Sequence, residues 1–232
     1  AEANVDKSIV NPNCFTESNV VGTQNLINLA VKYKAKLFVY QSTDEVYGSL
    51  DKESPPWKED SPLDPKNAYS ATKASGEMLL KAAHNTHGLD YLIVRSCNNM
   101  GPRQDPSKLI PRVLKCIQDQ KPIPVYGNGE QSRDWIHTLD NASAILTLLQ
   151  KEKKNEVYNI SAGLERKNID TINTICDIVG DGKELIKFVD DRPGHDTRYA
   201  IDSTKLRELG WAPRYKTFED ALKNTISWYQ AN

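Results

Sequence analysis

Two short segments carry side chains whose types and spacing could oxidise an alcohol and then eliminate water. The first covers residues 42–48 (STDEVYG) and the second covers residues 69–73 (YSATK). Tyr69 and Lys73 are four residues apart, so on a helix they share one face. An ammonium beside a phenol stabilises the phenolate and lowers its pKa from about 10. The pair could therefore form a base that takes a hydroxyl proton while hydride leaves for NAD⁺.

The first segment adds two adjacent carboxyl groups. Asp44 and Glu45 follow a predicted strand, where neighbouring side chains project to different sides, so one could act as a protonated acid and the other as an ionised base. Each feature alone also fits a plain structural interpretation. Asp-Glu is commonly a pair of solvated loop acids, Thr43 could be a turn hydroxyl, and a surface Tyr and Lys at this spacing arise often by chance.

The elements around these segments alternate between helix and strand. Apolar spacing predicts helices over residues 19–33 and 69–86, and strands over 36–41 and 91–95. Strands that alternate with helices in this order indicate an α/β fold with a parallel, doubly wound sheet of the Rossmann type. Residues 1–102 are interpreted as containing this sheet, and residues 103–232 mainly as a smaller α/β lobe intertwined with it.

The second half of the chain has a more mixed pattern. It predicts helices over 109–118, 139–150, 168–178 and 218–230, and short strands over 123–126, 156–160 and 185–189. None of the 12 glycines forms the glycine-rich turn that holds a dinucleotide pyrophosphate.

Composition excludes several classes of protein. The chain has 232 residues, of which 38% are hydrophobic and 26% charged, which is typical of a soluble globular protein. A net charge of −1 does not favour nucleic acid as a partner, and no apolar run reaches the roughly 20 residues of a membrane helix. Four cysteines without a C-x-x-C pair argue against a metal site or a disulfide framework, and indicate reduced thiols in a cytoplasmic protein.

Taken together, the motifs carry a family resemblance. The segments 42–48 and 69–73 closely resemble those of the extended short-chain dehydrogenase/reductases, specifically the nucleotide-sugar 4,6-dehydratases, such as those that act on dTDP-glucose. The resemblance continues in order through residues 95–102, 108–111, 124–129, 133–135, 158–160, 166–168, 191–196, 210–211 and 228–229. The Thr-Asp-Glu triplet is the discriminating part, because related epimerases and decarboxylases lack the paired acid and base.

The resemblance implies a role for each residue of the triplet and of the Tyr-Lys pair. Tyr69 would be the base that takes the proton of the sugar C4 hydroxyl during its oxidation. Lys73 would tune the pKa of Tyr69, and Thr43 would orient the C4 oxygen. Glu45 would remove the C5 proton and Asp44 would protonate the departing C6 hydroxyl. The cofactor would be NAD, regenerated within each cycle. The resemblance also implies that residues 1–102 are the carboxyl-terminal part of an NAD-binding domain and that residues 103–232 are mainly a substrate-binding lobe.

Other positions match the family's binding residues. Ser18 and Asn99 match positions near the nicotinamide half of NAD, together with Tyr69 and Lys73. The predicted contacts to a nucleotide-diphosphate sugar are Asn98, Lys108, Leu109, Val125, Tyr126, Arg133, Asn168, Arg192 and His195. The two arginines suit a diphosphate, because a guanidinium can bind its oxygens bidentately. Family members pair through the two helices predicted at 19–33 and 69–86, so we expect a homodimer.

The sequence also departs from the family pattern. Ala3 and Asn4 replace a serine and a histidine, and Met100 replaces a tyrosine, which we expect to alter packing rather than chemistry. The family's first three strands and glycine-rich turn precede the first residue here, so we expect these 232 residues alone to bind NAD weakly or not at all.

Several alternatives stay open at this point. The chain could be an epimerase or decarboxylase acting on a UDP-sugar, or a non-catalytic protein that binds a sugar nucleotide. The sequence does not choose between dTDP-glucose and UDP-glucose, because the two bases differ by one methyl group, worth about 1 kcal/mol in an apolar pocket.

Overall fold

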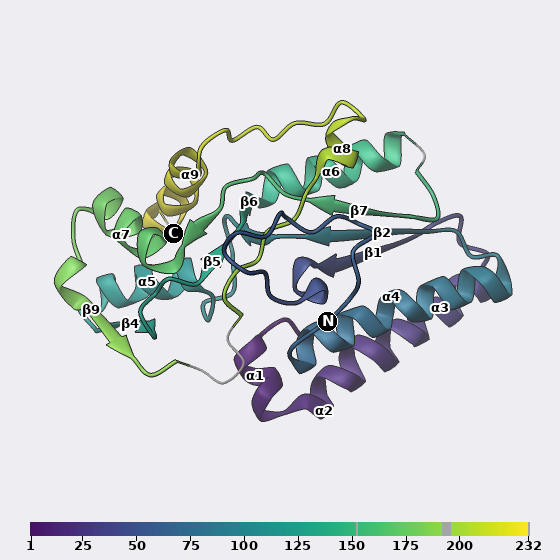
Figure 1. The fold of residues 1–232 in the computed structure, drawn as a ribbon, viewed down its shortest axis with the longest axis horizontal. Coiled ribbons are helices and arrows are strands. Elements are labelled where there is room, and N and C mark those ends of the chain that lie inside the picture. Colours follow the sequence, from purple (N-terminus) through teal and green to yellow (C-terminus); the bar gives the residue numbers. More distant parts are fainter. Residues whose placement is uncertain (152, 192–195, 232) are drawn as a thin grey trace.

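A three-stranded parallel sheet forms the centre of the chain. A computed structural model describes residues 1–151, 153–191 and 196–231. The sheet has the order β1-β2-β7, with β1 at Phe38–Thr43, β2 at Tyr91–Ser96 and β7 at Glu156–Ile160 (Figure 1). Every residue of β2 is buried, as expected for a parallel strand covered on both faces. The predicted parallel α/β fold is confirmed.

Helices cover both faces of this sheet. In Figure 1, α3 (Gly22–Lys32) and α4 (Ala68–His87) lie on one side of the sheet, and α6 (Thr138–Gln150) and α8 (Thr204–Arg207) lie on the other. Successive side chains of β2 point to opposite faces of the sheet, so they pack in two separate cores. Ile93 packs in the cluster that contains Leu80 of α4, whereas Leu92 packs in the cluster that contains Leu148 of α6.

The helix that carries Tyr69 and Lys73 has a well-defined start. The Asn67 side chain accepts a hydrogen bond from the Ser70 amide at 2.9 Å, and the Asn67 amide donates to the Ser70 hydroxyl at 3.3 Å. This reciprocal pair is a capping box, which satisfies free amides at the helix start. Gly88, at a φ of 70°, ends the helix in the left-handed conformation that favours glycine.

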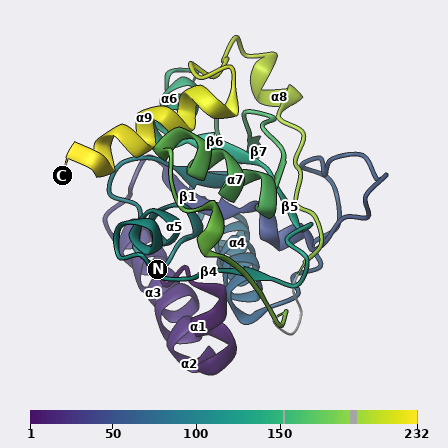
Figure 2. The same cartoon turned by 90° about the vertical axis from the view of Figure 1, so that its left-hand side faces the viewer.

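A smaller lobe has its own core. It contains α5 (Leu109–Gln118), α7 (Asn168–Val179) and α9 (Phe218–Ala231), with β4 (Ile123–Tyr126) paired in parallel with β9 (Ile186–Val189) (Figure 2). Ile110, Ile172 and Leu222 are among the buried residues of its core. Short ladders join it to the sheet: β3 (Asn98–Met100) with β6 (Trp135–His137), and β5 (Ser132–Arg133) with β8 (Arg166–Lys167).

The predicted elements are confirmed with small changes in their bounds. The largest change concerns residues 19–33, where a π-helix, η1 (Thr16–Val21), precedes α3. The sequence missed α1 (Val5–Val10) and α2 (Pro12–Phe15). Two short 3-10 helices were also not predicted, η2 (Asp44–Tyr47) and η3 (Lys183–Leu185). Because η3 includes Leu185, the strand predicted at 185–189 starts one residue later, as β9.

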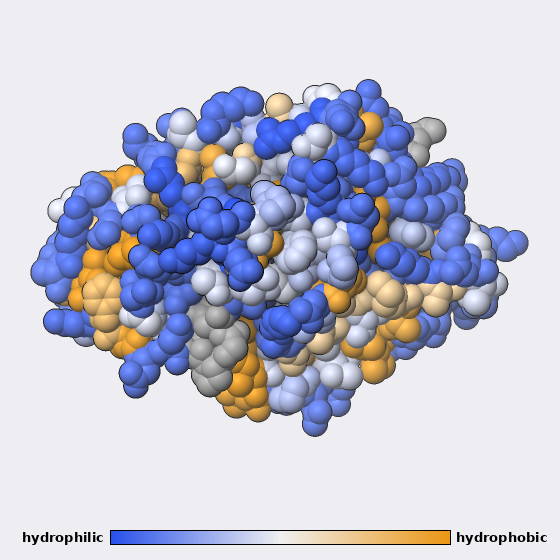
Figure 3. All heavy atoms as spheres, in the orientation of Figure 1, coloured by the Kyte–Doolittle hydropathy of each residue, from blue (hydrophilic) through white to orange (hydrophobic). Residues whose placement is uncertain are grey.

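The face of the molecule shown in Figure 3 is mostly polar. Figure 3 shows hydrophilic side chains over most of one face, with hydrophobic side chains in separate groups between them. Within the described part of the chain, no helix is both long and apolar enough to span a membrane.

Candidate active site

The carboxyl ends of the three sheet strands bring chemically active residues together. The register aligns Thr43 with Ser96 and Ser96 with Ile160. The next residues of the three strands are Asp44, Cys97 and Ser161, and they are all buried. In parallel α/β sheets, ligands bind at this edge.

Asp44 opens η2 and is 2% exposed. Its Oδ1 accepts a hydrogen bond from the Thr43 hydroxyl at 3.2 Å. Its Oδ2 is buried and has no hydrogen-bond partner among the described residues. Burial raises the pKa of this carboxyl well above its ordinary value, and the negative charges of Glu45 and Asp134 raise it further. A group of this kind is suited to hold a proton and donate it.

Glu45 is more open to its surroundings than Asp44. It is half-buried and lines a pocket, and its Oε2 accepts a hydrogen bond from the Asn67 amide group at 3.4 Å. Burial raises the pKa of Glu45, while the positive charge of Arg133 and the bond from Asn67 oppose that rise. Asn67 therefore has two functions, as the cap of α4 and as a partner of Glu45. The sequence signal that could have found it is an asparagine three residues before Ser70 at a helix start.

Tyr69 and Lys73 lie on one face of α4, but Lys73 makes a different contact from the one predicted. Its Nζ donates to the Gln41 carbonyl oxygen at 2.5 Å and lies 4.3 Å from the centre of the Tyr40 ring. Burial lowers the pKa of Lys73 to about 8. The pKa of Tyr69 is raised rather than lowered, because burial and the charges of Glu45 and Asp44 outweigh a hydrogen bond with Thr43. The predicted direction of the Tyr69 pKa is thereby corrected.

A buried asparagine joins the first turn of α4 to the start of the chain. The Asn19 side chain accepts from the Glu2 amide at 2.8 Å, and donates to the Glu2 carbonyl and the Thr72 hydroxyl, each at 3.0 Å. Thr72 in turn donates to the Tyr69 carbonyl at 2.8 Å. Asn19 therefore fixes the backbone that carries Tyr69. Nothing local in the sequence marked it, because Thr72 lies 53 residues away.

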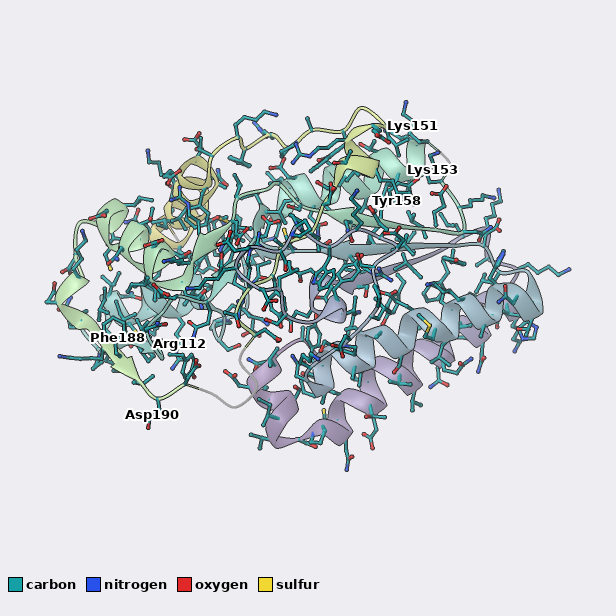
Figure 4. The ribbon with its side chains drawn as sticks, in the orientation of Figure 1. Arg112, Lys151, Lys153, Tyr158, Phe188 and Asp190 are labelled. Atoms are coloured by element: carbon teal, nitrogen blue, oxygen red, sulfur yellow. The ribbon has the colours of Figure 1, made fainter. Side chains whose placement is uncertain are left out.

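A pocket opens beside Glu45 and extends into the lobe. Its lining includes the following predicted substrate residues: Asn98, Lys108, Leu109, Val125, Tyr126, Arg133 and Asn168. Arg192 and His195, also predicted to contact the substrate, lie outside the described residues. The pocket is also lined by Arg112, and Figure 4 shows this side chain on α5 at the same end of the lobe as Phe188 of β9.

Arg133 is held in a fixed orientation within the pocket wall. It donates from Nη1 to the Ser132 carbonyl at 2.7 Å and from Nη2 to the Asp196 carbonyl at 3.0 Å. Its guanidinium lies 4.6 Å from the centre of the Tyr199 ring, which also lines the pocket. Sequence reasoning missed Tyr199. A guanidinium held on an aromatic face is preorganised to bind an anion.

Asn99, one of the residues predicted to lie near the nicotinamide half of NAD, has a hydrogen-bond acceptor that no described residue satisfies. The Oδ1 of Asn99 is buried without a hydrogen-bond partner among the described residues, while its Nδ2 donates to the Cys97 carbonyl at 3.0 Å. An unpaired amide oxygen suits a carboxamide N–H, so this position fits a nicotinamide. Ser18 lies on η1 and is half-buried.

The departures from the family pattern have structural consequences at the pocket. Lys108 donates through Nζ to the Ala3 carbonyl, a contact that needs no side chain at position 3. Asn4 caps α1 by accepting from the Lys7 amide at 3.0 Å, and donates to the Ser107 hydroxyl at 2.9 Å. Met100 is fully buried in the core of the lobe, as expected for a packing residue.

Comparison with known proteins agrees with this arrangement. The family model described as GDP-mannose 4,6 dehydratase matches residues 1–225. The chain belongs to this family. It is 44% identical to the low-salt glycan biosynthesis protein Agl12 of Haloferax volcanii, covering 99% of this chain and 73% of that protein. It is 43% identical to a dTDP-glucose 4,6-dehydratase of Streptomyces niveus, covering 100% of this chain and 68% of that enzyme.

Solved structures show the same fold. DesIV, a dTDP-glucose 4,6-dehydratase from Streptomyces venezuelae solved with NAD and TYD bound, superposes with a TM-score of 0.96 at 43% identity, covering 100% of this chain and 71% of that one. A UDP-glucose 4-epimerase from Thermotoga maritima superposes with a TM-score of 0.92 at 30% identity, covering 100% of this chain and 75% of that one. The fold is therefore common to dehydratases and epimerases, and the site residues have to discriminate between them.

Proposed function

We propose that this chain is an NAD-dependent lyase, a nucleotide-sugar 4,6-dehydratase that converts dTDP-glucose to its 4-keto-6-deoxy product. The observation that carries the proposal is the Thr43-Asp44-Glu45 triplet beside Tyr69. Its two carboxyls have different surroundings, since Asp44 is buried and its Oδ2 has no hydrogen-bond partner within the described ranges, whereas Glu45 opens into the pocket. Similarity to dTDP-glucose 4,6-dehydratases along the whole chain supports the same activity.

The side chains divide the reaction between them. Tyr69 takes the proton of the C4 hydroxyl, and the Thr43 hydroxyl orients the C4 oxygen. The ketone formed at C4 makes the C5 proton acidic, and Glu45 removes it. Asp44 donates its proton to the C6 hydroxyl, which leaves as water. These steps need Asp44 protonated and Glu45 ionised at the same pH.

When bound, NAD would supply the hydride acceptor at C4 and the hydride donor at C6. Glu45 then returns its proton to C5, which completes the 4-keto-6-deoxy product. Lys73 and Tyr69 on α4 and the unpaired Oδ1 of Asn99 are the groups that would hold its nicotinamide ribose and carboxamide. The substrate diphosphate would bind Arg133, whose guanidinium is already fixed by backbone carbonyls.

The test is product analysis by mass spectrometry with dTDP-glucose and UDP-glucose in parallel, with NAD in large excess because these 232 residues are expected to bind it weakly. A 4,6-dehydratase yields a product lighter by one water, and we expect dTDP-glucose to be the better substrate. Asp44→Asn and Glu45→Gln should each abolish this product. Asp60→Asn, which changes an exposed loop carboxyl, is the matched control and should leave it unchanged.

An epimerase would give a product without loss of water in the same experiment. A product with the mass of the substrate but a different sugar configuration would identify an epimerase and overturn the proposal. Unchanged water loss in both carboxyl variants would refute the roles given to Asp44 and Glu45.

We also propose that two copies of the chain form a homodimer through α3 and α4. Large apolar side chains are exposed on η1, α3, α4 and the residue that follows α3: Val21, Leu26, Leu29, Tyr33 and Met78. Exposed apolar side chains that cluster on two neighbouring helices are typical of an interface between subunits.

A further inference from the structure

A second carboxyl group lies against the row of residues at the strand ends. Asp134 comes between β5 and β6 and is 2% exposed. Its Oδ2 accepts from the hydroxyl of Ser161, the residue that follows β7 in the row Asp44, Cys97 and Ser161. The Asn98 amide donates to the Asp134 carbonyl at 3.1 Å, which fixes its backbone beside the same strand ends.

The two carboxyls have opposite hydrogen-bond surroundings. Asp134 accepts from the Ser161 hydroxyl, from the Leu164 amide at 2.9 Å and from the Trp135 amide. Asp44 accepts from the Thr43 hydroxyl alone, and its Oδ2 has no partner among the described residues. Burial raises the pKa of Asp134 to about 6, and these donors oppose that rise by stabilising the ionised form. Burial raises the pKa of Asp44 well above its ordinary value, with the Thr43 hydroxyl as its donor. If one of the two carries a proton, the surroundings assign it to Asp44.

We propose that Asp134 is a positioning residue for the acid step, whose buried carboxylate keeps the proton on Asp44. The inference rests on the proposed function, since it assigns the group that prepares Asp44 for its role as the acid. Two buried carboxylates that share one site do not both ionise readily, because like charges repel in a medium of low dielectric constant. The carboxylate that is better supplied with hydrogen bonds ionises first and holds the other neutral.

Other charged and titratable groups face this pair and have to be taken into account. Asp44 faces Glu45 on its own element, Arg133 on β5, Cys97 after β2 and Tyr69 on α4. Among these described groups Arg133 is a cation, and its charge lowers the pKa of Asp44 while that of Asp134 raises it. Asp134 in turn faces Glu165 and Arg198, which form an ion pair with each other at 2.6 Å.

The first experiment follows the carboxyl protons without substrate. In protein labelled with ¹³C at the aspartate carboxyls, NMR titration gives the order in which Asp134 and Asp44 ionise, with Asp44→Asn used for assignment. We expect Asp134 to ionise at lower pH than Asp44. The reverse order would overturn the proposal even if the variants below failed to fold.

The second experiment removes the charge. Asp134→Asn keeps the shape and an amide oxygen for the Leu164 amide, and should move the titration of Asp44 to lower pH. The alkaline limb of the turnover rate should move with it. Asp140→Asn is the matched control, because Asp140 is also 2% exposed and accepts two backbone hydrogen bonds, from Arg214 at 2.7 Å and Tyr215 at 3.2 Å. It should leave the titration of Asp44 unchanged.

The outcomes separate this inference from the proposed function. An Asp44 titration that is the same in wild type and Asp134→Asn shows that Asp134 has only a structural role, and overturns the inference. A shift of the Asp44 titration in a protein that shows no dehydratase activity supports the coupling between the charges of Asp134 and Asp44, and contradicts the proposed function.

Discussion

Replacing Glu77 with glutamine should destabilise the protein strongly and disturb the active-site segment. Glu77 lies one helical turn beyond Lys73 on α4 and is fully buried. It accepts from Arg95 at 3.1 Å and 2.6 Å, and from the Ser42 hydroxyl at 2.5 Å. Arg95, itself 2% exposed, also donates to the Tyr47 hydroxyl at 2.7 Å. This network therefore joins α4 to β1, to β2 and to the last residue of η2.

The size of the effect follows from the burial of both partners. Glu77→Gln leaves the Arg95 guanidinium without its counter-ion inside the protein, where no water compensates the charge. Removing one partner of a buried ion pair costs about 3–5 kcal/mol, a large part of a typical stability of about 5–15 kcal/mol. With an m-value of about 3 kcal/mol per molar urea, the unfolding midpoint should fall by about 1–1.7 M.

Urea unfolding followed by circular dichroism measures this change, with Glu208→Gln as the control because Glu208 is an exposed glutamate. The double variant Glu77→Met with Arg95→Met should recover part of the loss, because no unpaired charge stays buried. A midpoint for Glu77→Gln within 0.3 M of the wild type, taken as about 1 kcal/mol at the same slope, would refute the reasoning.

Three further predictions concern the site and the surface. Turnover should fall as pH rises through about 8, because the ammonium of Lys73, whose pKa is lowered to about 8, then loses its proton; Lys73→Arg should remove this contribution to the alkaline limb and leave the contribution of Asp44. Gly76→Ala should lower the urea midpoint by the equivalent of about 1–3 kcal/mol, because its Cβ would lie 2.1 Å from the Tyr40 hydroxyl oxygen. Leu26→Glu on α3 should give monomers in size-exclusion chromatography with light scattering, whereas Leu146→Glu on α6, also 57% exposed in the wild type, should leave a dimer.

The sequence predicts most of the fold because the main elements follow simple patterns. Residues 91–94 are a continuous apolar run and form most of a fully buried parallel strand. The helix predicted at 69–86 is confirmed as α4, with its cap at Asn67. The exceptions are short or irregular: α1 is a six-residue helix with one buried residue, and nothing in the apolar spacing of residues 16–21 distinguishes a π-helix from an α-helix.

The site was predictable only where a residue belongs to a recognisable motif. The predicted substrate residues that lie in the described part of the chain all line one pocket, although they come from widely separated segments. Asn19, Tyr199 and Asp134 were missed as site residues because their importance depends on partners distant in the sequence. Asp134, for example, is bound to Ser161, 27 residues away. The pKa of Tyr69 was predicted in the wrong direction because the spacing of Tyr and Lys does not reveal that the phenol is buried beside Glu45 and Asp44.

The raised pKa of Tyr69 links the two halves of the proposed reaction. The charges of Glu45 and Asp44 both raise this pKa, and therefore oppose ionisation of the phenol. A proton on Asp44 removes one of these charges, so the acid that is prepared for the elimination also makes it easier for Tyr69 to act as a base in the oxidation. Asp134 then has an effect on both steps through one proton. Asp134→Asn should consequently slow C4 oxidation as well as water loss at alkaline pH, where Asp44 becomes ionised earlier than in the wild type.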